Sequence, residues 1–220
     1  MDYLQALPHY NRRLMDDLQQ IATDDQIWKA FRSRRRLRVA TDDGDLLPTK
    51  GTHGWVISTG RRILLTCADP VNGPFDTASS TRSELAGCAS VLYFLARPAE
   101  FWGMKHKCWL LWYCDSKAAI SRIRRHASRS SYWTRLPPDA DLLAIICQHK
   151  LALRTSCALI WVKGHQDSHS TSAPRSLALT LNIHADRLAR AKYRNTGSCT
   201  SSELVPHIPE QQCSISINGV

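Results

Sequence analysis

The segment Cys108–Cys114 constrains the fold of this chain more than any other, because its residues, C-W-L-L-W-Y-C, are all apolar. Such a run is typical of a β-strand that is covered on both faces, which requires a layer of helices on each side of a sheet. A second, nearly all-apolar run at Ser156–Val162 predicts another strand. A helical pattern follows the first run directly, at Ser116–Arg125. We therefore expect an α/β fold.

The other periodicities predict the element order β-β-β-α-β-α-α-β-α. Alternating apolar residues from Leu37 to Thr41 indicate the first strand, which ends in a D-D-G turn. Two further strands are expected at Gly54–Ser58 and Arg62–Cys67, joined by a Thr59-Gly60 hairpin turn. The helical patterns lie at Thr81–Ala96, Ser116–Arg125, 139–153 and around Leu181–Leu188. This order implies a mixed sheet flanked by helices.

Three regions are expected along the chain. Residues 1–34 form an α-helical N-terminal extension, with one helix at 9–22 and a helical patch around Ile27, Trp28 and Phe31. Residues 35–193 form the main domain, and residues 194–220 a Ser-rich tail with a candidate short strand. The tract Arg32–Arg38 holds five arginines, and it is either a solvated linker or a strip that contacts phosphates.

Four acidic residues, Asp43, Glu84, Asp115 and Asp186, are the candidate metal ligands. Asp115 follows the apolar run and precedes Ser116, which can cap the next helix. Ligands commonly bind at such a strand-to-helix junction. Carboxylates that are held close together repel and raise one another's pKa, so a cluster of them is stable as anions only when cations neutralise it.

Each of three acids also has an alternative role. Asp42 competes with Asp43 for the site position on the first strand, but the phase of the alternating pattern and the following glycine favour Asp43. Thr81 and Glu84 have the spacing of a capping box, in which Glu84 bonds to the start of its own helix. The alternative for Asp186 is a surface salt bridge with a neighbouring arginine.

The acids lie in the motifs T-D-D-G-D (41–45), S-T-R-S-E-L (80–85), W-Y-C-D-S (112–116) and N-I-H-A-D-R-L-A (182–189), and W-V-K-G-H ends at His165. In this order the motifs resemble the type 1 ribonuclease H family, including the ribonuclease H domains of reverse-transcribing elements. The resemblance implies a five-stranded mixed sheet with helices on both faces. It implies two Mg²⁺ ions, or Mn²⁺ in their place, held by Asp43, Glu84, Asp115 and Asp186, with His165 moving a proton or aiding product release.

The activity that the resemblance implies is cleavage of the RNA strand of RNA–DNA hybrids, which leaves 5′-phosphate and 3′-hydroxyl ends. The expected nucleic-acid contacts are Gly44, Ser80, Thr81, Arg82, Ser116 and Lys163, with Arg122, Arg125 and Trp133 from a basic, aromatic segment. The family usually has a small residue at Asp45, Asn at Ser80–Thr81 and Glu at Ile183. These departures leave open a catalytically weak or inactive hybrid-binding domain, repurposed from a retroelement. A related transposase or integrase would use fewer acids and would cut DNA.

The composition indicates which kinds of partner and which compartment to expect. Lys and Arg number 29 against 19 Asp and Glu, a net charge of +10 that favours a polyanionic partner, here an RNA–DNA hybrid. The 8 cysteines form no C-x-x-C pair, so we expect reduced core thiols. No signal peptide or membrane-spanning stretch is visible, which predicts an intracellular protein of the nucleus or cytoplasm. We expect no small-molecule cofactor, and either a monomer or part of a larger retroelement-type assembly.

Overall fold

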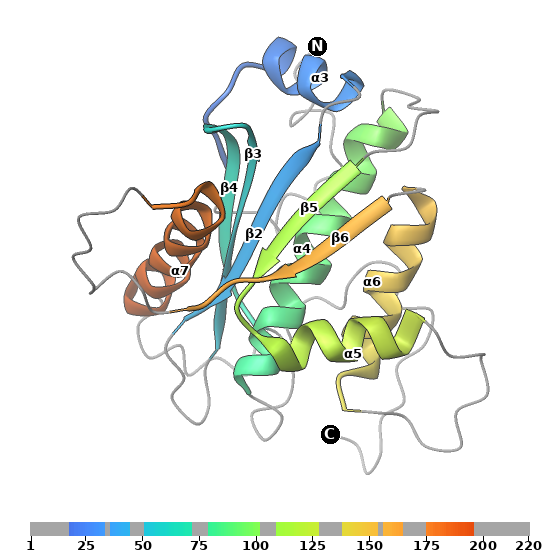
Figure 1. Ribbon diagram of the computed structural model, residues 1–220, viewed down its shortest axis with the longest axis vertical. Coiled ribbons are helices and arrows are strands. Elements are labelled where there is room, and N and C mark those ends of the chain that lie inside the picture. Colours follow the sequence, from blue (N-terminus) through green and yellow to red (C-terminus); the bar gives the residue numbers. More distant parts are fainter. Residues whose placement is uncertain are drawn as a thin grey trace.

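The computed structural model describes residues 18–33, 36–44, 51–71, 79–101, 109–127, 138–153, 156–164 and 175–195 (Figure 1). The strands are β1 (Gln19–Gln20), β2 (Leu37–Asp43), β3 (Thr52–Thr59), β4 (Arg62–Pro70), β5 (Trp109–Cys114) and β6 (Ser156–Trp161). The helices are α3 (Asp24–Arg32), α4 (Ser80–Phe101), α5 (Lys117–Ala127), α6 (Ala140–Ala152) and α7 (Leu177–Asn195). From β2 onward, this order confirms the one predicted from periodicity.

The strands form one mixed sheet in the order β1-β4-β3-β2-β5-β6. The β2–β3–β4 meander is antiparallel, whereas β5 and β6 run parallel to β2. Residues 109–114 of the apolar run form β5, which lies between two neighbouring strands as its composition predicted. Cys108 lies outside the described residues. In the register, Val39 of β2 pairs with Trp112 of β5, and Asp42 pairs with Gly54 of β3.

Helices cover both faces of the sheet, as predicted (Figure 1). Helix α7 packs against β2 and β3 on one face and encloses a small core that includes Ala40, Val56 and Leu181. Helices α4, α5 and α6 lie on the other face, over a larger core that contains the fully buried Trp112. Because side chains alternate along a strand, Ala40 faces α7 while Val39 belongs to the larger core.

The N-terminal part of the described chain differs from the prediction in two ways. The sheet has six strands rather than five, because β1 adds to its edge by pairing with β4. Residues 19 and 20, expected to be helical, therefore form a strand, and the rest of the predicted helix 9–22 lies mostly outside the described residues. The helix predicted around Ile27 is confirmed as α3. Its Ile27, Ala30 and Phe31 are buried in the larger core, so α3 is part of the packed molecule rather than a helical extension.

The opposite edge of the sheet is β6. The strand itself is confirmed, but it is only partly buried, with Ile160 37% and Trp161 46% exposed, although its sequence is nearly all apolar. Arg124 of α5 donates a hydrogen bond from Nη2 to the backbone carbonyl of Leu159 at 2.9 Å. Val162 donates its N–H to Cys114 on β5, so the alternate carbonyl of Leu159 points away from β5.

Two predictions from composition can be compared with the structure. Cys67, Cys88 and Cys114 are buried free thiols, and Cys147 and Cys157 are half-buried free thiols. The predicted reduced core thiols are therefore found at these positions. Among the described residues, no helix is both long and apolar enough to cross a membrane.

Candidate metal centre

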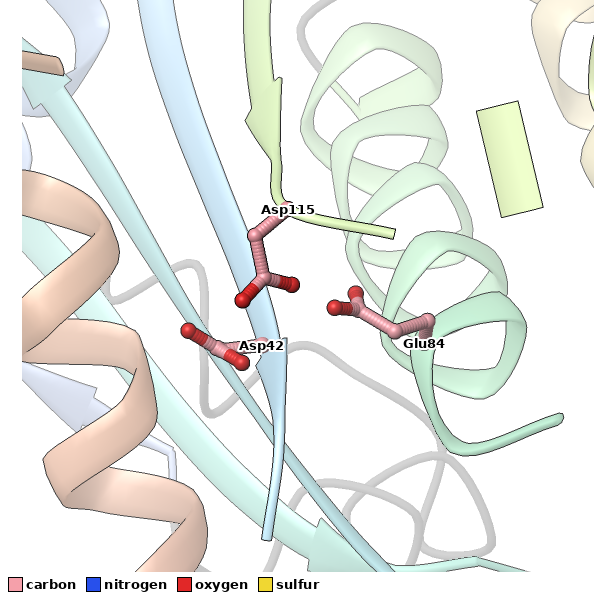
Figure 2. A group of neighbouring side chains, drawn as sticks. All are labelled: Asp42, Glu84 and Asp115. Atoms are coloured by element: carbon pink, nitrogen blue, oxygen red, sulfur yellow. The ribbon is translucent and has the colours of Figure 1, made fainter. Parts of the chain in front are cut away.

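Three carboxyl groups from separate elements converge at one end of the sheet. Asp42 lies on β2, Glu84 on α4, and Asp115 directly after β5. Figure 2 shows the three side chains pointing toward one another, and one oxygen of each lies within 4.8 Å of the others. Oxygen ligands at this spacing suit a hard divalent cation such as Mg²⁺. The cluster of Asp42, Glu84 and Asp115 is called the acidic cluster below.

The residue that β2 contributes is Asp42, whereas the phase of the strand pattern favoured Asp43. Asp43 pairs across the strands with His53, which lies against Gly87 of α4 on the face of the larger core. Asp42 faces α7 instead, where Asn182 donates a hydrogen bond from its side-chain amide to Asp42 Oδ2. The prediction assumed that the site residue shares the face of Leu37 and Val39. The acidic cluster is assembled from the other face of β2.

Glu84 is held by the second turn of α4 and does not cap its helix. The N-cap of α4 is Ser79, whose Oγ accepts a hydrogen bond from the Arg82 N–H at 3.0 Å. The alternative role for Glu84, a capping box with Thr81, is therefore not found, because the helix begins earlier than the sequence pattern indicated. Glu84 is fully buried, and its Oε2 accepts a hydrogen bond from the thiol of Cys114 at 3.6 Å.

Asp115 lies where β5 ends and α5 is about to begin. Ser116 caps α5, accepting the Ala119 N–H on its Oγ at 3.2 Å, so Asp115 is not needed for capping, as predicted. Gly164, which follows β6, lies against the Asp115 side chain, and a Cβ at Gly164 would collide with Asp115 Oδ2. The absence of a side chain at position 164 leaves room for this carboxylate.

Asp186, the fourth predicted ligand, lies on α7 beside the acidic cluster. It is 7% exposed, and it lies one helical turn beyond Asn182, which donates a hydrogen bond to Asp42. The charge of Asp186 also raises the pKa of Asp42. Asp186 also forms an ion pair with Arg190, Oδ1 to Nε, at 2.7 Å. Gly54 lets α7 come this close, because a Cβ there would collide with the backbone carbonyl of Ala185.

The electrostatics of the acidic cluster favour a bound cation. Burial, together with the negative charges of Asp115, Asp186 and Asp43, raises the pKa of Asp42 to about 9, although a hydrogen bond from the Asp43 backbone acts in the opposite direction. Burial raises the pKa of Glu84 well above its usual value, and Cys114, Asp42 and Asp115 add to the shift. Glu84 Oε1 is buried with no hydrogen-bond partner among the described residues. A divalent cation would be coordinated by Glu84 Oε1 and would neutralise the repulsion among the three carboxylates.

The residues that were predicted to contact nucleic acid differ in burial and in their partners. Arg82 is buried and donates to Asp139 and Asp141 at 2.6–3.2 Å, and Arg122 pairs with Asp139 as well. These two arginines therefore join helices inside the domain. Gly44 is buried, Ser80, Arg125 and Lys163 are exposed, and Thr81 and Ser116 are half-buried. His165 and Trp133 lie outside the described residues.

Asn182 and Cys114 contact the acidic cluster but were not among the predicted site residues. Asn182 precedes Asp186 by one helical turn, and this spacing could have indicated that both face the same strand. Cys114 precedes Asp115 directly, but no sequence pattern links its thiol to Glu84, which lies on another element.

Among the solved structures with a similar fold are ribonucleases H. The N-terminal ribonuclease H domain of a Mycobacterium tuberculosis protein, solved as a fusion with maltose-binding protein, matches with a TM-score of 0.50 and 16% identity, over 73% of this chain and 95% of that chain. RNase H1 from the archaeon Halobacterium salinarum matches with a TM-score of 0.47 and 16% identity, over 73% of this chain and 98% of that one. LC11-RNase H1 in complex with an RNA/DNA hybrid matches with a TM-score of 0.46 and 13% identity, over 60% and 88%.

No family model matches the chain, and no curated protein matches it in sequence. The likeness to the mycobacterial domain, at 16% identity, concerns the fold. The chain thus has a ribonuclease H-like α/β fold, with the acidic cluster at one end of its sheet.

Proposed function

We propose that the protein is a metal-dependent endoribonuclease that hydrolyses the RNA strand of RNA–DNA hybrids. The observation that carries this proposal is the acidic cluster, in which Asp42, Glu84 and Asp115 present oxygens within 4.8 Å of one another in a ribonuclease H-like fold. Buried carboxylates at this spacing repel one another, and a bound metal ion would neutralise this repulsion. The order of the five motifs in the sequence supports the same function.

Asp42, Glu84 and Asp115 would hold the metal, and Asp186, whose charge raises the pKa of Asp42, would contribute a fourth carboxylate. Two Mg²⁺ ions, when bound, would activate water and stabilise the leaving oxygen at a phosphodiester. The protein supplies position: Asn182 and the Asp43 N–H orient Asp42, and Cys114 orients Glu84. Partners of this kind are commonly worth about 10–100-fold in metal affinity or activity. The products would carry 5′-phosphate and 3′-hydroxyl ends.

The first test compares two neighbouring carboxylates. We expect Asp42→Asn to lower the rate of hybrid cleavage by more than about 100-fold, because it removes a ligand rather than a partner of one. Asp43→Asn is the matched control, since it changes the adjacent residue on the same strand, and it should keep most of the activity. The assay is cleavage of an end-labelled RNA–DNA hybrid in Mg²⁺, with duplex DNA and duplex RNA as other substrates and EDTA as the metal-free blank.

The opposite result, an active Asp42→Asn and an inactive Asp43→Asn, would show that β2 contributes the other carboxylate. Cleavage of duplex DNA without cleavage of hybrid would contradict the proposed substrate.

A second candidate, a hybrid-binding domain with little or no activity, is favoured by one observation. Asp186 forms an ion pair with Arg190, and the family's glutamate is replaced at Ile183, so the fourth carboxylate has a competing cation within its own helix. Tight binding of the hybrid with no cleavage in Mg²⁺ or Mn²⁺ would identify this function. In that case Arg190→Gln should restore some cleavage, because it frees Asp186 for a metal ion.

A further inference from the structure

Trp161, the last residue of β6, is exposed beside the acidic cluster. Its indole Nε1 donates a hydrogen bond to the backbone carbonyl of Asp115 at 2.8 Å, and its register partner on β5 is Cys114. The side chain is nevertheless 46% exposed, whereas Trp55 and Trp112 in the core are 0% and 1% exposed. An aromatic ring is thus fixed at the border of the site by the backbone of a site residue.

Lys117 lies next to this ring. Its Nζ is 4.3 Å from the centroid of the Trp161 ring, within the range of a cation–π interaction. Lys117 is the first residue of α5, where the helix dipole disfavours a positive charge. No carboxylate pairs with Lys117 within 4.0 Å in the part of the chain that the structure describes. The ammonium is exposed and is therefore available to an external anion.

A role in stability alone does not account for this pair. The hydrogen bond to Asp115 needs only the indole N–H, and it leaves nearly half of the ring in solvent. Lys163, two residues beyond Trp161, is a second exposed cation on the same segment.

We infer that Trp161 and Lys117 bind one nucleotide of the nucleic-acid strand that enters the acidic cluster. The Lys117 ammonium contacts a phosphate of that strand, and the exposed ring of Trp161 packs against the adjoining sugar or base. Such contacts tolerate any sequence, because every nucleotide has a phosphate and an apolar ring face. The inference rests on the proposed function and adds to it a nucleotide-binding surface on the side of α5 and β6.

The experiment measures equilibrium binding of a fluorescein-labelled RNA–DNA hybrid, in EDTA and again with Ca²⁺, across a series of salt concentrations. We expect Trp161→Leu to weaken binding about 5–100-fold, the range of one lost base–aromatic contact, without changing the salt dependence. Lys117→Gln should weaken binding and lower the slope of log K against log salt by about one, because one phosphate contact is lost.

Two matched controls separate the surface from general effects. Trp109→Leu removes a tryptophan of similar exposure, 50%, at the other end of β5, and Lys29→Gln removes an exposed lysine of α3 that pairs with Asp25 at 2.7 Å. Both should leave binding and its salt slope unchanged. Trp161→Phe keeps a ring but cannot donate to Asp115, so it should bind better than Trp161→Leu. If Trp161 served only through its hydrogen bond, the two variants would be equally impaired.

The outcomes distinguish this inference from the proposed function. Wild-type binding that is unaffected by Trp161→Leu and Lys117→Gln overturns the nucleotide-binding surface and leaves the nuclease proposal standing. Binding that these variants weaken, in a protein that never cleaves, supports the surface and refutes the nuclease. A wild-type protein that binds no hybrid in either condition refutes both.

Discussion

The ionised form of Asp42 is strongly disfavoured in the folded protein. Its side chain is 3% exposed, its hydrogen-bond donors are the Asn182 amide and the Asp43 N–H, and three other carboxyl groups raise its pKa. Two donors do not compensate for the loss of water and the repulsion of three acids. If stability alone were under selection, an uncharged residue at position 42 would be favoured.

The first prediction at this scale concerns stability in the absence of metal. The pKa of Asp42 is about 9 in the folded chain against 3.8 unfolded, so its contribution to stability is complete below pH 3.8 and is lost as pH rises toward 9. The raised pKa of Glu84 acts in the same direction. From pH 6.5 to 9 in EDTA, we expect the free energy of unfolding to fall by up to about 1.4 kcal/mol per pH unit for each group.

The measurement is urea denaturation at several pH values, for the wild type and for Asp42→Asn. The variant should be the more stable protein at pH 8 in EDTA, and Mg²⁺ should stabilise only the wild type. Burial lowers the pKa of His53 to about 4, against 6.5 in the unfolded chain, so this residue raises the stability with pH up to about pH 7.5. The comparison with Asp42→Asn cancels this contribution, because both proteins contain His53. A wild-type stability that is flat from pH 6.5 to 9 would contradict the raised pKa.

At the scale of the element, strands and helices were predictable because their signals are local. The apolar run of β5 and the stripe of α4 are consecutive patterns that depend on one element only. The choice between Asp42 and Asp43 was not local, since it depends on α7, which lies about 140 residues further along the chain and supplies Asn182. The start of α4 at Ser80 was missed for a similar reason: the cap, Ser79, lies outside the periodic segment.

The arginines at 82 and 122 were predicted as nucleic-acid contacts, and the structure uses them to join three helices. Asp139, just before α6, accepts from Arg82 of α4 and Arg122 of α5, while Asp141 accepts from Arg82 at 2.6 Å. The side chains of Arg82 and Asp139 are 8% and 6% exposed. Asp139 also has a left-handed backbone, with φ at 62°, which Asp and Asn tolerate better than other side chains.

We therefore predict that Asp139→Asn lowers the free energy of unfolding by about 2–4 kcal/mol, because it leaves the buried Arg82 and its neighbour Arg122 with one carboxylate fewer. Asparagine keeps the size and the left-handed tolerance, so the loss reports charge. Asp25→Asn is the control: it breaks the exposed Asp25–Lys29 pair, and it should cost less than about 1 kcal/mol. Equal losses in the two variants, measured by urea denaturation, would rule out a structural role for the Arg82 network.

At the scale of the whole molecule, one core joins the first described helix to those that follow the sheet. Ile27, Ala30 and Phe31 of α3 share their cluster with α4, α5 and α6. The sequence suggested a separate N-terminal helical extension, because the basic tract after Phe31 has the composition of a linker. Composition alone does not indicate that the apolar side of α3 packs against the sheet.

The corresponding prediction is that Phe31→Ala destabilises the entire domain, by about 3–5 kcal/mol, in a single unfolding transition. The reason is that Phe31 is 7% exposed and lies in the larger core, so its loss leaves a cavity there. Circular dichroism and tryptophan fluorescence, followed together through urea denaturation, should give coincident curves. An early, separate transition in the variant would show that α3 folds independently of the sheet.

The hydrogen bond from the Arg124 guanidinium to the outward carbonyl of Leu159 affects whether another polypeptide can pair with β6. An outermost strand is a template on which another polypeptide can add itself, and repeated addition leads to fibrils. Any chain that approached β6 would first have to displace this arginine, and it would meet the positive charge of α5 as it did so. The bond thus protects a strand whose apolar sequence would otherwise promote aggregation.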